Sequence, residues 1–259
     1  MAFETIRLDQ DINAVATLTL NRPDSLNALS ARLLDEMRAA VESLPDSGAR
    51  ALLVTGAGRG FSSGADLASD GGLPEDVGAA LEAHFNPLVE ALFACPLPIV
   101  AAVNGPCAGA GCSLALAADI VIAGRSAYFL QAFINIGLIP DAGATWLLPR
   151  LVGRARAMEM MMMGERIPAD RAADWGMISR VVDDEALLDE AGALAARLAR
   201  GPTKAYGLLR RLAREAEQLP LSEALWAERI AQREAGWTED FRSAVFAFLQ
   251  KQPPTFRGA

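Results

Sequence analysis

Short segments in which apolar residues alternate with polar ones, or follow one another without a break, fill much of the first half of the chain and predict β-strands. Residues 3–9 and 13–20 are expected to form two paired strands joined by a turn at Gln10-Asp11. Residues 50–55 are almost continuously apolar, as buried strands are. The pattern therefore predicts a sheet that contains at least one buried strand.

A glycine turn stands at the centre of the stretch from residue 104 to residue 119. Strand-like segments, residues 99–103 and 120–123, flank this stretch, and its turn Gly109-Ala110-Gly111 is followed by an Ala/Leu-rich run. We expect a strand, a tight turn, a buried helix and a second strand. The free N–H groups at the beginning of such a helix attract a negative oxygen.

A second glycine-rich turn, residues 56–67, follows the strand predicted at residues 50–55. Ligands of open α/β sheets bind at the carboxyl ends of strands. Each of the two turns could offer a backbone N–H to one oxygen, and two such donors form an oxyanion hole. The spacing leaves open the alternative that both turns are only tight connections.

Apolar residues at helical spacing predict a helix over residues 26–44 and another over residues 79–94. Pro87 predicts a kink or a restart in the second helix. The polar residues 70–78 before it are expected to be mobile. Residues 128–148 are interpreted as short strands and turns.

The remainder of the chain is predicted to be mostly helical. Pro168 and Pro202 suit first helical positions, and Gly164, Gly176 and Gly236 suit helix ends. The expected helices are residues 154–164, 168–175, 185–200, 202–217, 221–236 and 238–251. Their apolar faces would either fold back on the core or pack against another subunit.

Composition restricts the class of protein and its partners. The 259 residues are 52% hydrophobic and have a net charge of −8, so neither nucleic acid nor an anionic membrane is an expected partner. Residues 91–118 carry no charge, but three prolines interrupt them, which argues against a membrane span. The polar N-terminus has no apolar signal core, so we expect a cytosolic protein. Cys95, Cys107 and Cys112 lie among apolar residues and are expected to be packing thiols.

Several motifs point to chemistry that the rest of the chain does not support. Residues 60–64 match the G-x-S-x-G pattern of serine hydrolases, but the triad needs a late histidine, and the chain's one histidine is His84. Neither glycine turn is a phosphate loop, and Leu114 stands where the dinucleotide fingerprint needs its third glycine. No Cys/His/carboxylate cluster has metal-ligand spacing. We therefore expect neither a metal nor a nucleotide cofactor.

A series of motifs along the chain resembles the successive signatures of the enoyl-CoA hydratase/isomerase (crotonase) superfamily. These motifs are Asn21-Arg22-Pro23 with Asn27-Ala28-Leu29, Phe61-Ser62-Ser63-Gly64-Ala65-Asp66-Leu67, Ala102-Val103-Asn104-Gly105 with Gly109-Ala110-Gly111, Ala118-Asp119-Ile120, and Gly137-Leu138-Ile139-Pro140. The resemblance implies an α/β crotonase (ClpP-like) spiral of ββα units. It also implies a core over residues 1–185, a helical trimerisation region over residues 186–259, and a homotrimer or a dimer of trimers.

The resemblance also assigns roles to residues. In that family two backbone N–H groups bind the thioester oxygen of an acyl-CoA, and they fall here on Ala65 and Ala110. The residues expected to bind the CoA moiety are Ser25, Leu26, Ala28, Ser63, Asp66 and Leu67. The two glutamates that activate water in family hydratases fall on Ser113 and Phe133, which are not carboxylates. Hydration by the usual mechanism is therefore not expected.

The segment around Asp141 is similar to the ring-1,2-epoxyphenylacetyl-CoA isomerase branch, in which an aspartate at this place is taken as the acid/base. From the residues alone, an aspartate before Ala-Gly-Ala-Thr more often caps a helix. Phe133, Ile139 and Trp146 are near in sequence, and an apolar wall would raise the pKa of the Asp141 carboxyl. Phe133 and Trp146 are also expected to contact the substrate.

The resemblance thus implies a CoA-thioester isomerase with one aspartate as acid/base. It would convert 3-enoyl-CoA to 2-enoyl-CoA, ring-1,2-epoxyphenylacetyl-CoA to oxepin-CoA, or both. CoA would enter as part of the substrate, with no separate cofactor. Two alternatives stay open, namely a hydratase with an atypical acid/base and a non-catalytic acyl-CoA-binding subunit.

Overall fold

The computed structural model describes residues 3–67 and 76–259. Residues 70–75, part of the segment predicted to be mobile, lie outside the described residues. In the part of the chain that is described, no helix combines the length and the apolar character needed to cross a bilayer.

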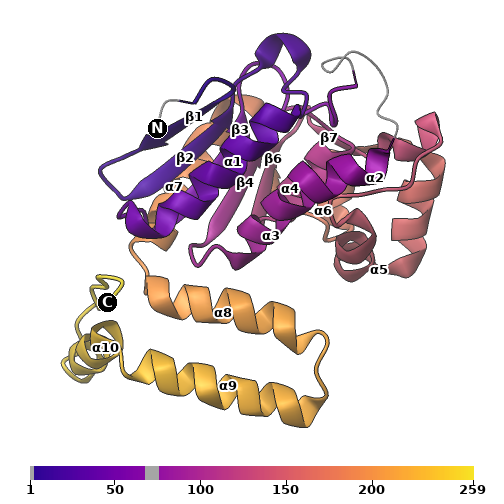
Figure 1. The fold of residues 1–259 in the computed structure, drawn as a ribbon. Coiled ribbons are helices and arrows are strands. Elements are labelled where there is room, and N and C mark those ends of the chain that lie inside the picture. The colour runs from indigo at the N-terminus through magenta and orange to yellow at the C-terminus, as the bar shows by residue number, and fades with distance from the viewer. Residues whose placement is uncertain (1–2, 68–75) are drawn as a thin grey trace.

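A mixed sheet of six strands forms the centre of the molecule (Figure 1). In the order β1-β2-β3-β4-β6-β9, β1 is antiparallel to β2 and all other neighbours are parallel. The strands are β1 (Ile6–Gln10), β2 (Val15–Leu20), β3 (Ala51–Gly56), β4 (Ile99–Val103), β6 (Ile120–Gly124) and β9 (Arg180–Val182). The first five confirm the strand predictions, while β9 is too short to show a periodic pattern.

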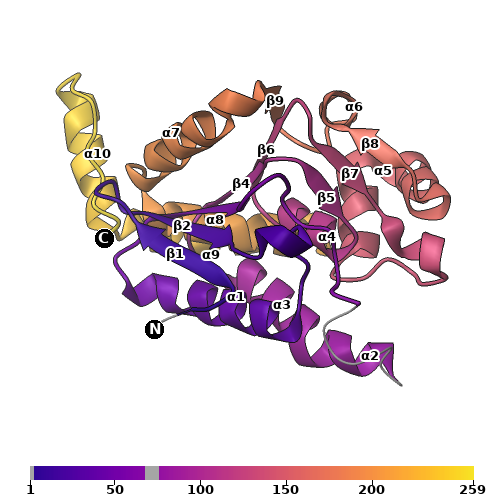
Figure 2. The same ribbon diagram turned by 90° about the horizontal axis from the view of Figure 1, so that it is seen from above.

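Helices cover both faces of this sheet, so its inner strands β2, β3, β4 and β6 are mostly buried on both sides (Figure 2). In β3, Leu52 and Val54 join the larger apolar core, and Ala51 and Leu53 join a smaller one. The larger core includes α1 (Ala31–Ser43), α3 (Asn86–Ala94) and α4 (Ala110–Leu116), and the smaller one includes α7 (Leu187–Ala199). Alternate side chains of a strand point to opposite faces, which explains the nearly continuous apolar sequence of residues 50–55. The α/β prediction is confirmed.

A small second sheet lies beside the first one. Its order is β5-β7-β8, with β5 (Pro106–Ala108), β7 (Tyr128–Leu130) and β8 (Arg166–Pro168). Strand β5 lies inside the central stretch, directly before the glycine turn that begins α4. Strands of three residues have no readable period, so the sequence predicted neither β5 nor β8.

Two predicted helices have different boundaries. The first helix begins at Ala31, because Leu26 and Asn27 have φ values of 53° and 55° and form a tight loop that includes η1 (Pro23–Ser25). The second restarts as predicted, since α2 (Val77–Ala80) and the π-helical η3 (Leu81–Phe85) precede α3, which has Pro87 in its first turn. Shorter helical turns are η2 (Leu44–Asp46), η4 (Ala132–Ile136) and η5 (Asp184–Ala186).

Helix α5 (Ala144–Met163) consists of two helical parts on either side of Gly153, and the second part begins at the predicted start, residue 154. The sequence missed the first part, so the interpretation of residues 128–148 as short strands and turns was wrong from residue 144 onward. Pro149 lies inside the helix, and Gly153 interrupts it with a φ of 76°. These two residues hid the helical pattern.

The predicted helix ends are largely confirmed. Gly164 ends α5 and Gly176 follows α6 (Ala169–Asp174), both with left-handed φ. Gly236 is the last residue of α9 (Leu221–Gly236). Pro168 and Pro202 are the N-caps of α6 and α8 (Thr203–Ala216), one residue before the first helical position predicted for them. Cys95, Cys107 and Cys112 are free and buried, as predicted.

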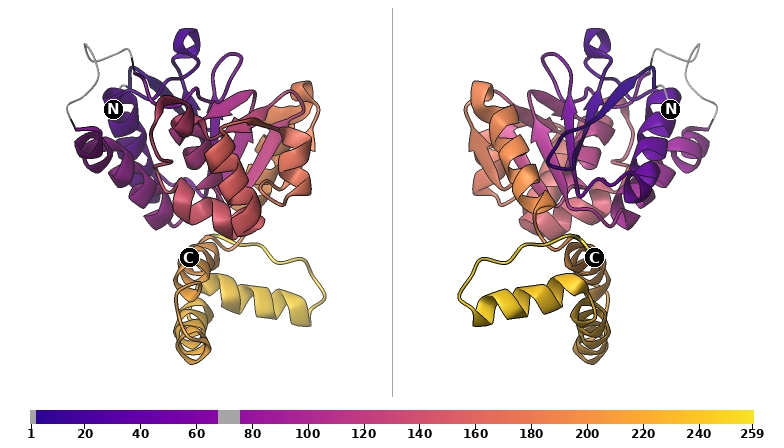
Figure 3. Two further views of the ribbon diagram at one scale, coloured as in Figure 1. Left: turned by 90° about the vertical axis from the view of Figure 1, so that its right-hand side faces the viewer. Right: turned by 90° about the vertical axis from the view of Figure 1, so that its left-hand side faces the viewer.

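The last three helices, α8, α9 and α10 (Glu239–Leu249), lie on one side of the sheet domain (Figures 1 and 3). Arg210 of α8, only 7% exposed, attaches them to it. Its Nε lies 2.6 Å from Asp119 Oδ2, and its guanidinium donates to the carbonyls of Leu92 and Cys95 at the end of α3. Helix α7 lies in the region predicted to be a separate helical part, residues 186–259, but it packs on the sheet. The division of the chain at residue 185 stays a prediction.

We expect Arg210→Ala to lower the free energy of unfolding by about 3 kcal/mol, because it removes the donor to the carbonyls of Leu92 and Cys95 and the closer of the two arginines that pair with Asp119. Urea unfolding measures the change. Arg211→Ala is the matched control on the same helix, since Arg211 is 56% exposed and should contribute little. Equal losses in both variants would contradict this role of Arg210.

Candidate active site

The two glycine turns of the sequence meet in space. The N–H groups of Phe61 and Ser62 donate to the Pro106 carbonyl at 3.0 and 3.1 Å, and Ala108 N–H donates to the Ser62 carbonyl at 2.9 Å. The first turn thereby runs alongside β5, which leads directly into the second turn at Gly109. Residues far apart in the sequence are thus held together by backbone hydrogen bonds.

Glycine is required where the turns touch. Gly64 has a φ of +94°, and a Cβ added there would lie 3.0 Å from the Ala108 carbonyl oxygen. Gly109 has a φ of +52°, and its added Cβ would lie 3.6 Å from the Cα of Gly64. The positive φ disfavours any larger residue at both positions, and at Gly64 the close approach of the Ala108 carbonyl does so as well.

Each turn presents a backbone donor next to its glycine. Leu29 N–H donates to the Gly64 carbonyl at 2.8 Å and Asp66 N–H donates to the Leu29 carbonyl at 3.1 Å, so the N–H of Ala65, between them, points away from Leu29. Ala110 is the first residue of α4, where N–H groups lack partners within the helix. Among the described residues neither N–H has an acceptor. The two donors predicted for a thioester oxygen therefore lie on adjoining turns.

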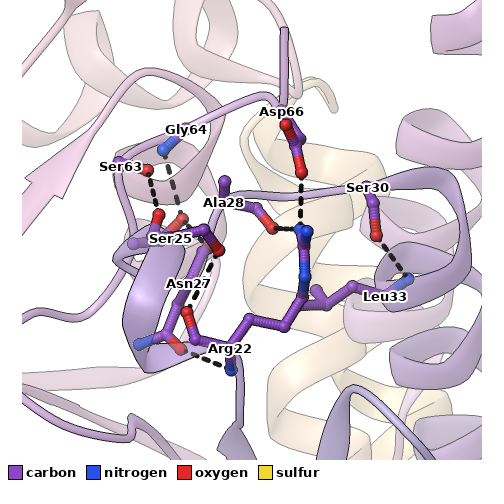
Figure 4. A network of polar contacts seen from close by, with 10 residues as sticks. Arg22, Ser25, Asn27, Ala28, Ser30, Leu33, Ser63, Gly64 and Asp66 are labelled. Atoms are coloured by element: carbon purple, nitrogen blue, oxygen red, sulfur yellow. Dashed lines mark hydrogen bonds and ion pairs between the residues drawn. The ribbon is translucent and has the colours of Figure 1, made fainter. Parts of the chain in front are cut away.

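An ion pair supports the Ala65 turn (Figure 4). Arg22 Nη1 lies 2.7 Å from Asp66 Oδ2 and also donates to the Ala28 carbonyl at 2.6 Å. The Asp66 side chain is 9% exposed, so the pair is largely shielded from water. The fully buried Asn27 accepts from Arg22 N–H at 2.9 Å and donates to the carbonyls of residues 57 and 60. These contacts give Arg22 and Asn27 a structural role, although the sequence marked them only as parts of a signature.

The segments predicted to bind CoA lie side by side. Ser63 N–H donates to the Leu26 carbonyl at 2.9 Å, and Ser63 Oγ donates to the Ser25 carbonyl at 3.2 Å. Ala28 and Asp66 meet through the Arg22 guanidinium. Leu67, 54% exposed, ends the described part of this turn. The structure thus brings the six residues together at one edge of the site.

Asp141 lies in the loop between η4 and α5. Its Oδ1 is buried and has no hydrogen-bond partner among the described residues, and burial raises the pKa of the carboxyl from 3.8 to about 6. The alternative that Asp141 caps a helix was wrong, because the N-cap of α5 is Gly143 and no side chain caps it. Ser113 Oγ donates to the Asp141 carbonyl at 3.0 Å. Since Ser113 lies one turn after Ala110 on α4, this bond places Asp141 near the second donor.

The residues of the predicted apolar wall have different surroundings. Phe133 is buried, and its ring edge lies 3.8 Å from where a Cβ of Gly109 would be. Trp146 contacts Phe93 of α3, with ring centroids 5.7 Å apart, and the Arg150 guanidinium lies 4.0 Å from its ring centroid. Ile139 is 78% exposed. Phe133 therefore lines the turn, whereas a substrate contact of Trp146 stays a prediction.

We expect Asp141→Asn to raise the free energy of unfolding at about pH 8 by about 1–2 kcal/mol, because the carboxylate is partly open to solvent and only part of its pKa shift becomes stability. The folded-state pKa of about 6 exceeds the ordinary value of 3.8, so charging Asp141 destabilises the folded state progressively between about pH 4 and pH 6 and fully above that range. Below about pH 3 the carboxyl is protonated in both states and the gain should vanish. Urea unfolding at both pH values measures this difference.

Asp189→Asn is the control for that measurement, since Asp189 is an exposed residue of α7. If Asp141→Asn raised the free energy of unfolding equally at both pH values, the new amide, and not the removal of a charge, would be the cause.

Residues 10–259 match the family model for enoyl-CoA hydratase/isomerase. The chain is 47% identical over 249 residues to the 1,2-epoxyphenylacetyl-CoA isomerase of Escherichia coli (strain K12), with 94% of this chain and 95% of that protein covered. It is 45% identical over 258 residues to a probable enoyl-CoA hydratase of Rhodobacter capsulatus, with 100% of both chains covered.

Solved structures agree with this assignment. The enoyl-CoA hydratase from Bacillus anthracis has a TM-score of 0.94 at 32% identity, over 99% of this chain and 100% of that one. A putative enoyl-CoA hydratase/isomerase from Mycobacterium abscessus has a TM-score of 0.92 at 39% identity, over 98% and 100%. The expected crotonase fold is thereby confirmed. The chain belongs to the enoyl-CoA hydratase/isomerase (crotonase) superfamily of enzymes that act on CoA thioesters.

Proposed function

We propose that this protein is an acyl-CoA isomerase in which Asp141 is the acid/base. The observation that carries the proposal is the partly buried Asp141 carboxylate, whose Oδ1 is buried and unpaired and whose pKa is raised to about 6. Such a pKa lets one group both accept and return a proton near neutral pH. Asp66, the other carboxylate of the site described above, forms an ion pair with Arg22, which stabilises the Ala65 turn.

The mechanism follows from these roles. Asp141 removes a proton from C2 of a 3-enoyl-CoA, and the electron pair of that C–H bond forms a C1=C2 double bond while the thioester carbonyl oxygen takes up the negative charge. The N–H groups of Ala65 and Ala110 stabilise the dienolate oxygen that results. Protonated Asp141 then returns the proton at C4, which leaves the 2-enoyl-CoA. No second acid/base is needed.

The same thioester clamp would support opening of an aryl epoxide and ring expansion to an oxepin-CoA. The similarity to a relative named 1,2-epoxyphenylacetyl-CoA isomerase favours this as a second substrate class. CoA would lie along Ser25, Leu26 and Ala28 and along Ser63, Asp66 and Leu67, and the acyl group would lie toward Phe133 and Trp146. Neither reaction changes the oxidation state or needs a separate cofactor.

Hydration is the second candidate, because a relative of nearly equal identity is named a probable enoyl-CoA hydratase. Ser113 and Phe133 cannot activate water as carboxylates, so a hydratase would have to use Asp141 for that purpose. A non-catalytic acyl-CoA-binding subunit is the third possibility. These alternatives predict different products from the same substrates.

We expect Asp141→Asn to abolish isomerisation, with a loss of about 1,000-fold or more, while acyl-CoA binding persists. The wild-type protein should convert a 3-enoyl-CoA or an aryl-epoxide CoA without a change in mass, as followed by mass spectrometry and ultraviolet absorbance. It should also exchange the C2 proton in deuterated water. Activity should fall as the pH drops below about 6, because protonated Asp141 cannot accept a proton.

Asp189→Asn, at an exposed position on α7, should leave turnover unchanged. Full turnover by Asp141→Asn would show that another group carries the proton. Addition of water to a 2-enoyl-CoA would favour the hydratase, and binding without C2 exchange would favour the non-catalytic subunit.

We further propose that the protein is a cytosolic homotrimer or dimer of trimers. Its last two helices expose many large apolar side chains, which a subunit contact would cover. They are Leu221, Leu225, Trp226, Ile230, Phe241, Val245, Phe246, Phe248 and Leu249.

Sedimentation equilibrium should give three or six times the chain mass of 27.4 kDa. A species of one chain mass at micromolar concentration would contradict the proposal.

A further inference from the structure

The beginning of α5 lacks a side-chain cap although a carboxylate lies close to it. Asp141 is two residues before the N-cap Gly143, and among the described residues the N–H groups of Gly143 and Thr145 have no acceptor. Helix N-termini favour a carboxylate through their free N–H groups and their dipole. The Asp141 carboxylate nevertheless makes no such bond, and its Oδ1 is buried without a partner.

The backbone around Asp141 keeps the carboxylate away from this helix end. Ala142 and Gly143 both have left-handed φ values, +49° and +84°. The carbonyl oxygen of Asp141 accepts two hydrogen bonds, from Ala144 N–H at 3.0 Å and from Ser113 Oγ at 3.0 Å. Together they fix the peptide between Asp141 and Ala142, and with it the backbone from which the Asp141 side chain extends.

The bond from Ser113 joins two elements, which is unusual for a serine inside a helix. A buried helical serine commonly donates to a carbonyl one turn earlier in its own helix. Ser113 is fully buried in α4, yet its hydroxyl reaches across to the loop before α5. The position that holds a glutamate in family hydratases thus contributes a hydrogen-bond donor here.

We propose that Ser113 is a positioning residue that holds the Asp141 carboxylate in the active site and away from the α5 N-terminus. The inference rests on the proposed role of Asp141 as acid/base. Without the Ser113 hydroxyl, only Ala144 N–H holds the Asp141 carbonyl, and the loop can turn the carboxylate toward the unpaired N–H groups of Gly143 and Thr145. Hydrogen bonds to these groups would stabilise the charged form.

Ser113→Ala tests this proposal. A titration of ¹³C-labelled aspartate carboxyls by NMR, with the Asp141 signal identified by its absence in Asp141→Asn, should show the Asp141 pKa lowered by about one unit. The acid limb of the kcat profile should move by the same amount, and kcat should fall about tenfold with KM little changed.

Matched variants separate positioning from general stability. Ser113→Thr keeps the hydroxyl and should restore both the pKa and kcat, whereas Ser113→Cys keeps the volume with a weak donor and should behave like Ser113→Ala. Ser43→Ala is the control, because Ser43 Oγ also donates to a backbone carbonyl, that of Ala40 at 2.7 Å, far from the site in sequence.

An unchanged Asp141 pKa in Ser113→Ala and Ser113→Cys would overturn the inference, even if both variants were less stable. The NMR titration needs no turnover, so it tests the position of the carboxylate independently. Loss of activity in Asp141→Asn, with no pKa change in the Ser113 variants, would therefore reject the inference and leave the proposed function standing.

Discussion

The close approach of two backbone turns, at Gly64 and Gly109, is the constraint on which the rest of the site depends. A Cβ at Gly64 would press against the Ala108 carbonyl oxygen, and both glycines have positive φ values that other residues rarely adopt. Strand β5 holds the turns in register through hydrogen bonds to Phe61 and Ser62. The N–H groups of Ala65 and Ala110, which follow these glycines, owe their neighbouring positions to this arrangement.

The surrounding structure keeps this backbone pair in place with buried polar contacts. Asn27 is fully buried and satisfies carbonyls of the first turn, while Arg22 neutralises Asp66 directly after Ala65. Buried polar groups of this kind are costly when unpaired, so a fully paired set favours one conformation. On the other turn, α4 is buried along its whole length and cannot shift without disturbing the core. Donors supported in this way need little reorganisation when charge develops on a substrate oxygen.

Asp141 differs from these satisfied groups, because its carboxylate is desolvated without a compensating partner. Its environment disfavours the charge that a base must carry, which raises its pKa toward neutrality. The environment that suits Asp141 for proton transfer near neutral pH therefore also lowers the stability of the folded protein. The isomerase proposal depends on this property of Asp141. Membership of the family is by itself equally compatible with isomerisation and with hydration.

The sequence by itself determined the features that local rules encode. The apolar runs predicted the five longer strands of the main sheet, the glycines marked the turns, Pro87 marked a helix restart, and the ordered motifs indicated the family. Only the tertiary structure decided which distant residues meet. It paired Arg22 with Asp66, turned Trp146 toward Phe93, left α5 without an Asp141 cap, and brought Ser113 to the Asp141 carbonyl. Periodicity and backbone preference act within a few residues, whereas such contacts depend on how packed helices and strands meet.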